Sequence, residues 1–311
     1  MNSKIRDSFV LYSKGMAMGA ADIVPGVSGG TVALITGIYD QLLKSIRSIN
    51  TQQLQKLVRL QFRDIWIHCN GTFLITLAAG IATSIIGLSG PILYALQHHP
   101  EMLRGLFFGL ILASAKLIAG QLGPWHQFPK ITGIIGILFA ITVNQIPAAQ
   151  ADSSMIYMGI CGAIAICAMI LPGISGSFIL LLLGNYDNVL NAIRHFEIKT
   201  LSVFAAGCIT GLLSFSHALG YALQHHRNQT MALLTGFMLG SLQKIWPWRM
   251  TTHWRINSHG EQVPWIDHAI FPTKSSLTDI ILVVICAVIG FFLVQILEKH
   301  GKEKHEITAR I

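Results

Sequence analysis

Long apolar runs alternate with short polar loops along most of this chain. A helix that crosses a bilayer needs about 20 largely apolar residues, and six continuous runs approach or exceed that length. We predict that these six runs form membrane-spanning helices, at 71–97, 101–121, 130–147, 200–223, 229–246 and 277–298. Most of the chain is therefore expected to lie in lipid.

Two further apolar segments, 19–43 and 168–190, are interrupted by helix-breaking residues. The interruptions share the pattern Pro-Gly-x-Ser-Gly, at Pro25, Gly26, Ser28, Gly29 and at Pro172, Gly173, Ser175, Gly176. A helix does not run unbroken through such a sequence. Non-helical backbone at membrane depth is tolerated only where it is buried in protein or lines a wet cavity. We therefore expect two re-entrant hairpins, at about 15–46 and 154–193, that line a site.

The two interrupted segments are copies within a tandem duplication. An offset of 147 residues aligns the two Pro-Gly-x-Ser-Gly patterns, and also Tyr39-Asp40 with Tyr186-Asp187. An offset of 127 residues aligns the hexapeptide YALQHH at 94–99 with the same six letters at 221–226. The change of offset locates an insertion in the first half, near the polar and basic stretch 48–68, which we expect to form a surface helix.

The duplication divides the chain into a first repeat, 1–150, and a second repeat, 151–311. Each repeat contains one broken helical hairpin and three membrane-spanning helices, and the second also ends in a charged tail. Because three crossings are an odd number, the second repeat must be inverted relative to the first. The predicted fold is thus an all-α membrane protein with an inverted tandem repeat, an arrangement typical of secondary transporters.

Charged residues are scarce and unevenly distributed. They make up 12% of the chain, whereas hydrophobic residues make up 52%; soluble domains carry about a quarter charged residues, so a soluble globular enzyme is excluded. In the inverted topology most lysines and arginines lie on the side of the two termini, which predicts cytoplasmic termini. The net charge of +8 indicates attraction to anionic membrane lipids and does not imply nucleic acid. The cysteines lack CxxC spacing, so we expect neither a metal nor a cofactor.

The two Pro-Gly-x-Ser-Gly patterns are suited to binding an anion. Glycine permits backbone that turns successive N–H groups inward, and the half-helices that begin near Gly30 and Ser177 direct their positive dipole ends to the same place. Ser28, Ser175 and Ser177 add hydroxyl donors without adding charge. The alternative is that the patterns only break helices and allow tight packing. Two copies at matched positions favour the anion-binding interpretation, and a phosphate monoester is a suitable ligand.

Four charged residues are further candidates. Asp22 lies in an apolar run before the first interruption, where a carboxylate typically marks an ion pathway; we expect it to couple transport to a proton or sodium ion, the alternative being a helix cap. Its counterpart is Met169. Lys116 either contacts a phosphate or extends to the membrane surface. Arg47 and Arg194 follow the two hairpins, where anchoring to the interface is favoured over headgroup binding.

The segments GAADIVPGVSGGTVALITGIYD and LPGISGSFILLLLGNYDNV, and the overall length, resemble the polyprenyl-phosphate transporter family of bacterial inner membranes, also called PopT. The resemblance covers essentially the whole chain. It implies a transporter, or flippase, that returns undecaprenyl phosphate across the inner membrane. This lipid carries cell-wall and surface-polysaccharide units.

The leading alternative is an enzyme similar to the undecaprenyl-pyrophosphate phosphatases. These enzymes also use inverted repeats, with a PGxSRS-like loop in which serine and arginine work with a glutamate pair. Here the loops read PGVSGG and PGISGS, without arginine, and no glutamate precedes Glu101. Phosphoanhydride cleavage needs charge neutralisation and an acid or base, so the sequence favours a transporter without catalytic residues. A small-anion secondary transporter is a third alternative.

Overall fold

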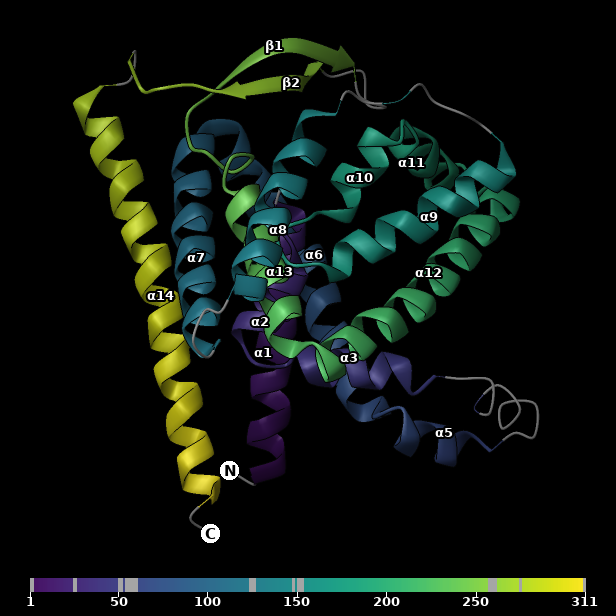
Figure 1. The fold of residues 1–311 in the computed structure, drawn as a ribbon. Helices are drawn as coiled ribbons and strands as arrows, with labels where there is room; N and C mark the ends of the chain where they lie inside the picture. The colour runs from purple at the N-terminus through teal and green to yellow at the C-terminus, as the bar shows by residue number, and fades with distance from the viewer. Residues whose placement is uncertain are drawn as a thin grey trace.

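The computed structural model describes residues 3–24, 27–49, 53, 61–122, 127–146, 149, 154–256, 262–273 and 276–309. In these residues helices dominate, with one pair of strands (Figure 1). The first half forms the helices α1 (Ser3–Ile23), α2 (Gly29–Ile35), α3 (Tyr39–Arg47), α5 (Phe62–His68), α6 (Gly71–His98), α7 (Pro100–Gln121) and α8 (Gln127–Gln145). The second half forms α9 (Met155–Ile170), α10 (Gly176–Leu182), α11 (Tyr186–Arg194), α12 (Ile198–His225), α13 (Arg227–Ser241), the strands β1 (Arg249–Ile256) and β2 (Gln262–Ala269), and α14 (Leu277–Ala309).

Five of the described helices are long and apolar enough to cross a bilayer: α6, α7, α8, α12 and the segment Leu277–Ile296 of α14. They match five of the six predicted spans. The sixth prediction, 229–246, is wrong in length, because α13 ends at Ser241 after 15 residues. At 1.5 Å per residue it is about 22 Å long, shorter than the hydrocarbon core. Ten of its residues are buried, so α13 lies inside the protein and not against lipid.

A two-stranded antiparallel sheet follows α13 and is an exception to the predicted all-α fold, which the described residues otherwise follow. Strand β1 pairs with β2 from Arg249 opposite Ala269 to Ile256 opposite Gln262. The strands contain threonine, tryptophan, valine and isoleucine, which favour extended backbone. Between two apolar runs these short strands resemble a polar loop in the sequence. In Figure 1 the sheet lies at the end of the molecule opposite both termini.

Helices are interrupted in both segments that were predicted to form hairpins. The first consists of the end of α1, then α2 and α3, and the second consists of α9, α10 and α11. Of the predicted surface helix 48–68, the structure describes α5, over Phe62–His68, while 50–52 and 54–60 lie outside the described residues. Each hairpin thus divides into one longer helix and two short ones.

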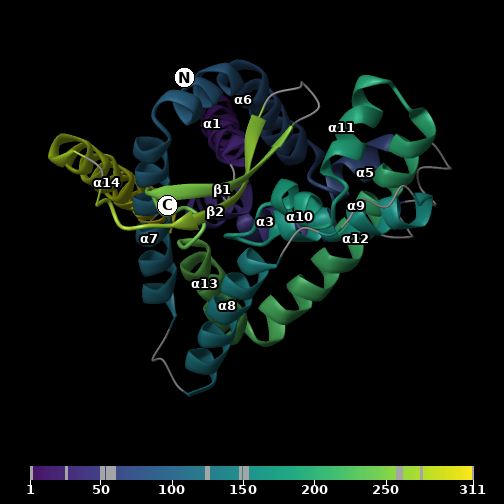
Figure 2. The same ribbon diagram turned by 90° about the horizontal axis from the view of Figure 1, so that it is seen from above.

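Equivalent helices of the two halves pack in the same way. The most extensive contacts join α1 to α6 and α9 to α12, and likewise α7 to α14 and α13 to α8 (Figure 2). On α1, a Cβ atom at Gly15 would collide with the carbonyl oxygen of Leu77, and on α9 one at Gly162 would collide with that of Phe204. These pairs correspond to each other through the offsets of 147 and 127 residues. The duplication seen in the sequence is therefore also a duplication of helix contacts.

The contacts of α8 with α13 and of α14 with α7 show that α8 and α14 are equivalent helices of the two repeats. Gly136 of α8 packs against the carbonyl oxygen of Leu233, and Gly290 of α14 packs against that of Leu106. Leu106 and Leu233 again differ by 127 residues, so Gly136 and Gly290 are equivalent, with an offset of 154. This offset gives the counterpart of each α8 residue in α14.

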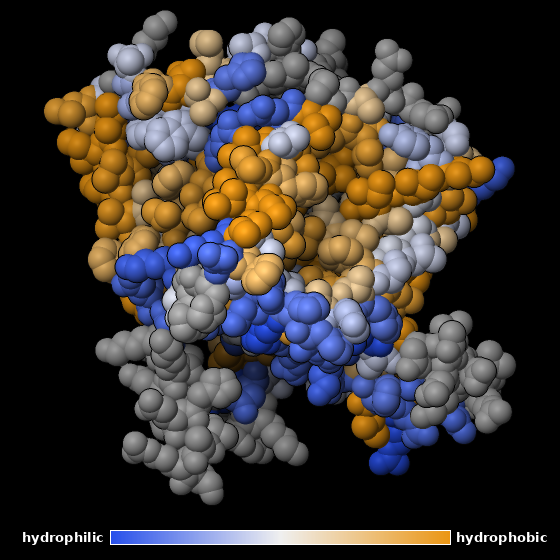
Figure 3. All heavy atoms as spheres, viewed as in Figure 1, coloured by the Kyte–Doolittle hydropathy of each residue, from blue (hydrophilic) through white to orange (hydrophobic). Residues whose placement is uncertain are grey.

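The outer surface is apolar over much of its area. Large side chains on α8 and α14 are exposed, among them Ile135, Val284 and Phe292, each about half accessible. Figure 3 shows hydrophobic residues over α14 and the middle of this face, with hydrophilic residues gathered toward the end that carries both termini. Soluble proteins rarely expose contiguous apolar patches of this kind. The surface is suited to contact with lipid tails.

Candidate functional site

The two broken segments meet inside the molecule. The Ser28 hydroxyl lies 3.1 Å from the carbonyl oxygen of Met169 and 3.3 Å from that of Leu171, and donates to this pair. In return, the backbone N–H of Gly173 donates to the Thr31 hydroxyl over 3.0 Å. Ser28 and Thr31 are completely buried. The first repeat therefore holds the interruption of the second one directly.

The end of α9 explains why hydroxyl groups are needed here. The last carbonyl groups of a helix have no partner within the helix, and α9 ends at Ile170. The buried Tyr39 hydroxyl donates to the carbonyl oxygen of Ile170 over 3.1 Å, next to the bonds made by Ser28. A Cβ at Gly30 would collide with the same oxygen. The first hairpin thus packs closely on the end of α9 and satisfies its free carbonyl groups.

Asp22 caps the start of α2. Its Oδ1 atom accepts the backbone N–H of Gly29 at 2.7 Å, and the Ser28 hydroxyl accepts that of Gly30 at 3.1 Å. A Cβ at Gly29 would collide with the Asp22 carboxylate. Asp22 therefore has the capping role that the sequence offered as the alternative to ion coupling. In the second half, Met169 stands at the equivalent position, so α10 has no such carboxylate.

The second interruption is shaped by close packing against α13. Gly173 has φ +85°, in the left-handed region, and a Cβ there would meet the backbone of Phe237 and Met238. Pro172 beside it is buried, and Gly176 packs against the carbonyl oxygen of Ala165. The corresponding Pro25 and Gly26 of the first interruption lie outside the described residues. Glycine at 173 is thus required both by its backbone angle and by its neighbours.

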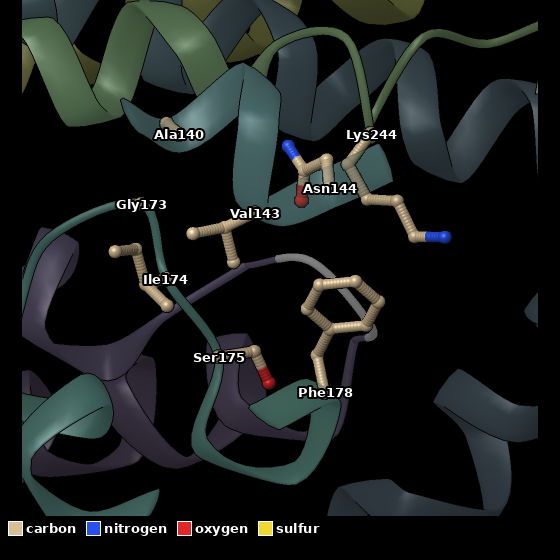
Figure 4. A pocket seen from close by; sticks show the side chains of 8 residues that line it. All are labelled: Ala140, Val143, Asn144, Gly173, Ile174, Ser175, Phe178 and Lys244. Carbon is tan, nitrogen blue, oxygen red and sulfur yellow. The ribbon is translucent and has the colours of Figure 1, made fainter. Parts of the chain in front are cut away.

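Ser175 is placed differently from Ser28. Its side chain makes no capping bond to α10, and its hydroxyl instead pairs with that of Ser177 over 2.9 Å. Ser175 also lines a small pocket between α8, the second interruption and the chain that follows α13 (Figure 4). The pocket-lining residues are Ala140, Val143, Asn144, Gly173, Ile174, Ser175, Phe178 and Lys244.

Lys244 is the charged residue of this pocket, and sequence reasoning missed it. Its Nζ atom lies 5.0 Å from the centre of the Phe178 ring, in a cation–π contact. In the sequence it is a lysine near the end of a predicted span, where lysines commonly anchor a helix at the membrane surface. Its repeat counterpart, Leu117, gives no hint of a conserved charge between the halves. Only the fold brings Lys244 to the second interruption.

The other predicted basic residues lie elsewhere. Lys116 has its Nζ atom 5.6 Å from the ring centre of Phe291 on α14. The Arg47 side chain packs against Gly220 of α12, and Arg194 lies exposed at the end of α11. None of the three lines the pocket. Within the described part of the chain, no group of three or more histidine, cysteine or acidic residues is arranged to hold a metal ion.

Known proteins resemble this chain over most of its length. The family model described as undecaprenyl phosphate translocase-like matches residues 18–263. A curated protein of Vibrio cholerae named polyprenyl-phosphate transporter is 45% identical over 308 residues, covering 97% of this chain and 100% of that protein. A Staphylococcus aureus protein of the same name is 36% identical over 253 residues, covering 75% of this chain and 84% of that protein. No solved structure gives a significant match.

The contact between the interruptions can be tested with Thr31→Val, which keeps the side-chain shape and removes the acceptor of the Gly173 N–H. A buried N–H without a partner costs about 1–3 kcal/mol, so we expect the purified protein to unfold at a lower temperature. The control is Thr132→Val, because the Thr132 hydroxyl donates to carbonyl groups of its own helix, at Phe128 and Pro129. Equal thermal stability of the two variants would contradict the importance of this contact.

Proposed function

The chain belongs to the undecaprenyl phosphate translocase-like family, and from this membership we propose that it transports polyprenyl phosphate, with undecaprenyl phosphate as its substrate, across the bacterial inner membrane. The observation that carries the proposal is the 45% identity, over nearly the whole of both chains, to a protein named polyprenyl-phosphate transporter. The apolar outer surface and the five span-length helices support a multi-pass membrane protein. The transporter returns the lipid carrier to the inner leaflet.

An inverted repeat with cytoplasmic termini is part of this proposal. It is supported by the recurrence of the helix crossings and by the position of both chain ends at one end of the molecule in Figure 1. Helices α3 and α5, which contain Lys44, Arg47 and Arg63, lie toward the same end. This distribution agrees with the positive-inside rule. The sheet β1–β2 would then face the outside.

The inverted topology predicts opposite sides for the two YALQHH copies, which end α6 and α12. In a variant without native cysteines, single cysteines introduced as His99→Cys and His226→Cys should react with a membrane-impermeant reagent from opposite sides of oriented vesicles. Reaction of both cysteines from the same side would contradict the inverted topology.

The two Pro-Gly-x-Ser-Gly segments form the proposed path of the headgroup. Non-helical backbone supplies polar groups where lipid offers none. Ser28 and Thr31 bond to the second segment, whereas Ser175 faces a pocket. Passage of a phosphate therefore requires the contacts between the two segments to part and their hydroxyl groups to bond to the headgroup. Lys116 and Arg47 serve as anchors, because their contacts with Phe291 and Gly220 lie away from this path. Arg194 has the same role, at its exposed position at the end of α11.

A transporter fits this site better than a phosphatase. Hydrolysis of a phosphoanhydride needs charge neutralisation together with an acid or base. The two segments, 19–35 and 168–182, contain Asp22 as their single charged residue, and its carboxylate is bonded to the Gly29 N–H. Lys244 can neutralise charge in the pocket, but none of the lining residues is an acidic residue or a histidine. We therefore propose that the chain is not an enzyme.

Transport can be measured as headgroup exposure in vesicles that contain purified protein and polyprenyl phosphate. A soluble phosphatase added outside should hydrolyse the whole lipid pool when the protein is present, and only the outer-leaflet fraction in protein-free vesicles. A Ser28→Ala, Ser175→Ala double variant should weaken lipid binding by about tenfold or more, because Ser175 is the hydroxyl of the pair that faces the pocket. Identical hydrolysis with and without wild-type protein would contradict transport.

We further propose that Asp22 couples transport to a cation, either a proton or sodium. Neutralising its carboxylate weakens the bond to the Gly29 N–H and so loosens the start of α2. Asp22→Asn keeps an oxygen that accepts this bond but cannot exchange a proton. Its transport should become insensitive to proton and sodium gradients while lipid binding is retained. Wild-type rates that ignore every gradient would leave Asp22 as a cap alone.

A further inference from the structure

We infer that the pocket between α8, α10 and the chain after α13 binds the phosphate monoester headgroup, with Lys244 as the cation that holds it. The inference rests on the proposed function, because it names the residue that receives that substrate. It assigns a site in the second repeat and none at the equivalent place in the first.

The polar groups of the pocket suit a phosphate monoester. A phosphate offers only acceptors at neutral pH apart from one titrating proton, so it needs donors. Lys244 supplies an ammonium group, Asn144 an amide, and Ser175 a hydroxyl that can turn from its Ser177 partner toward a ligand. None of the eight residues that line the pocket is acidic. The donors on these lining residues therefore suit an anionic ligand.

The apolar part of the lining suits a lipid. Ala140, Val143 and Ile174 face the same space as the polar groups, and Figure 4 shows Phe178 between Ser175 and Lys244. The ring of Phe178 lies 5.0 Å from the Lys244 ammonium, so this apolar residue also positions the cation. A headgroup with a hydrocarbon chain attached meets both kinds of surface here. Free phosphate would use only the polar part.

Among the described residues at the equivalent place in the first repeat, apolar side chains pack together. Leu117 corresponds to Lys244 and Val294 corresponds to Ala140, through the offsets of 127 and 154 residues. Val294 is 1% exposed and packs with Ile35 and Ala113, with Leu117 against them. The larger side chain at 294 and the missing cation leave an apolar contact where the second repeat has a pocket. Duplicated halves have thus diverged into one binding side and one closed side.

The position of the pocket gives the site a direction. Lys244 lies between α13 and β1, and the sheet occupies the end of the molecule opposite both termini. In the proposed topology this is the outer side. The pocket is therefore placed to take the headgroup of a polyprenyl phosphate from the outer leaflet, before it reaches the contact between the two interruptions.

The test measures binding of a C55 polyprenyl phosphate to the full-length protein in nanodiscs. Lys244→Met removes the charge and keeps a long side chain, and should raise the dissociation constant about tenfold to hundredfold, the loss typical of a bond to a charged group. Lys244→Arg should retain most of the affinity. The matched control is Lys130→Met, which removes the same charge from an exposed position on the first turn of α8, and should bind as wild type does.

Two further ligands separate the sources of the phosphate. Inorganic phosphate should compete with the lipid for the pocket of the wild-type protein. It should not compete in Lys244→Met. The corresponding polyprenol, which lacks the phosphate, should bind both proteins equally. An unchanged affinity of Lys244→Met for the polyprenyl phosphate would overturn the assignment, as would an equal loss in Lys130→Met. If the wild-type protein transports the lipid and either of these results is obtained, the assignment of the pocket fails and the proposed function stands. The two failures are therefore distinguishable.

Asn144→Asp gives an independent check at a second polar residue of the pocket, which lies beside Lys244 in Figure 4. The change adds a negative charge with almost no change in shape, so it should weaken binding of the polyprenyl phosphate at least as much as Lys244→Met. Thermal unfolding of each variant confirms that it is folded. Wild-type affinity in folded Asn144→Asp would also overturn the assignment.

Discussion

The carbonyl groups at the end of α9 set the main constraint on this structure. They stop being satisfied by their own helix at Ile170, in a chain surrounded by lipid, where an unpaired carbonyl group costs several kcal/mol. The hydroxyl groups of Ser28 and Tyr39 supply the missing donors from the other repeat. The two halves are thereby joined at their interruptions. The close approach of Gly30 to the carbonyl oxygen of Ile170 follows from the same requirement.

This contact makes two similar segments unlike each other. In the first, Asp22 and Ser28 cap α2, so its polar groups are bonded within the protein. In the second, Met169 replaces the carboxylate, and Ser175 is left to face the pocket with Lys244. A duplicated sequence has thus produced one segment that holds the halves together and one that is open to a ligand. Transport requires that the hydrogen bonds between the two segments can break and form again. This is possible because the net contribution of each such bond to stability is modest.

The sequence predicted the features that depend on local pattern. The spans α6, α7, α8, α12 and α14 were predictable because lipid selects for apolar length, and the breaks because proline and glycine act locally. The end of α13 at Ser241 was not predictable, since a helix buried in protein and a helix in lipid have similarly apolar sequences. Nor was the role of Lys244, because it depends on α8 and α10 lying beside it. Ser28 and Ser175 read alike in sequence and differ only through what surrounds them.

A structure determined in nanodiscs with bound polyprenyl phosphate would decide most directly whether the two segments have these separate roles. We expect the phosphate beside Lys244 and Ser175, with Ser28 still bonded to the carbonyl groups that end α9. A phosphate bound instead near Arg47, between α3 and α12, with the pocket empty, would contradict this description of the molecule.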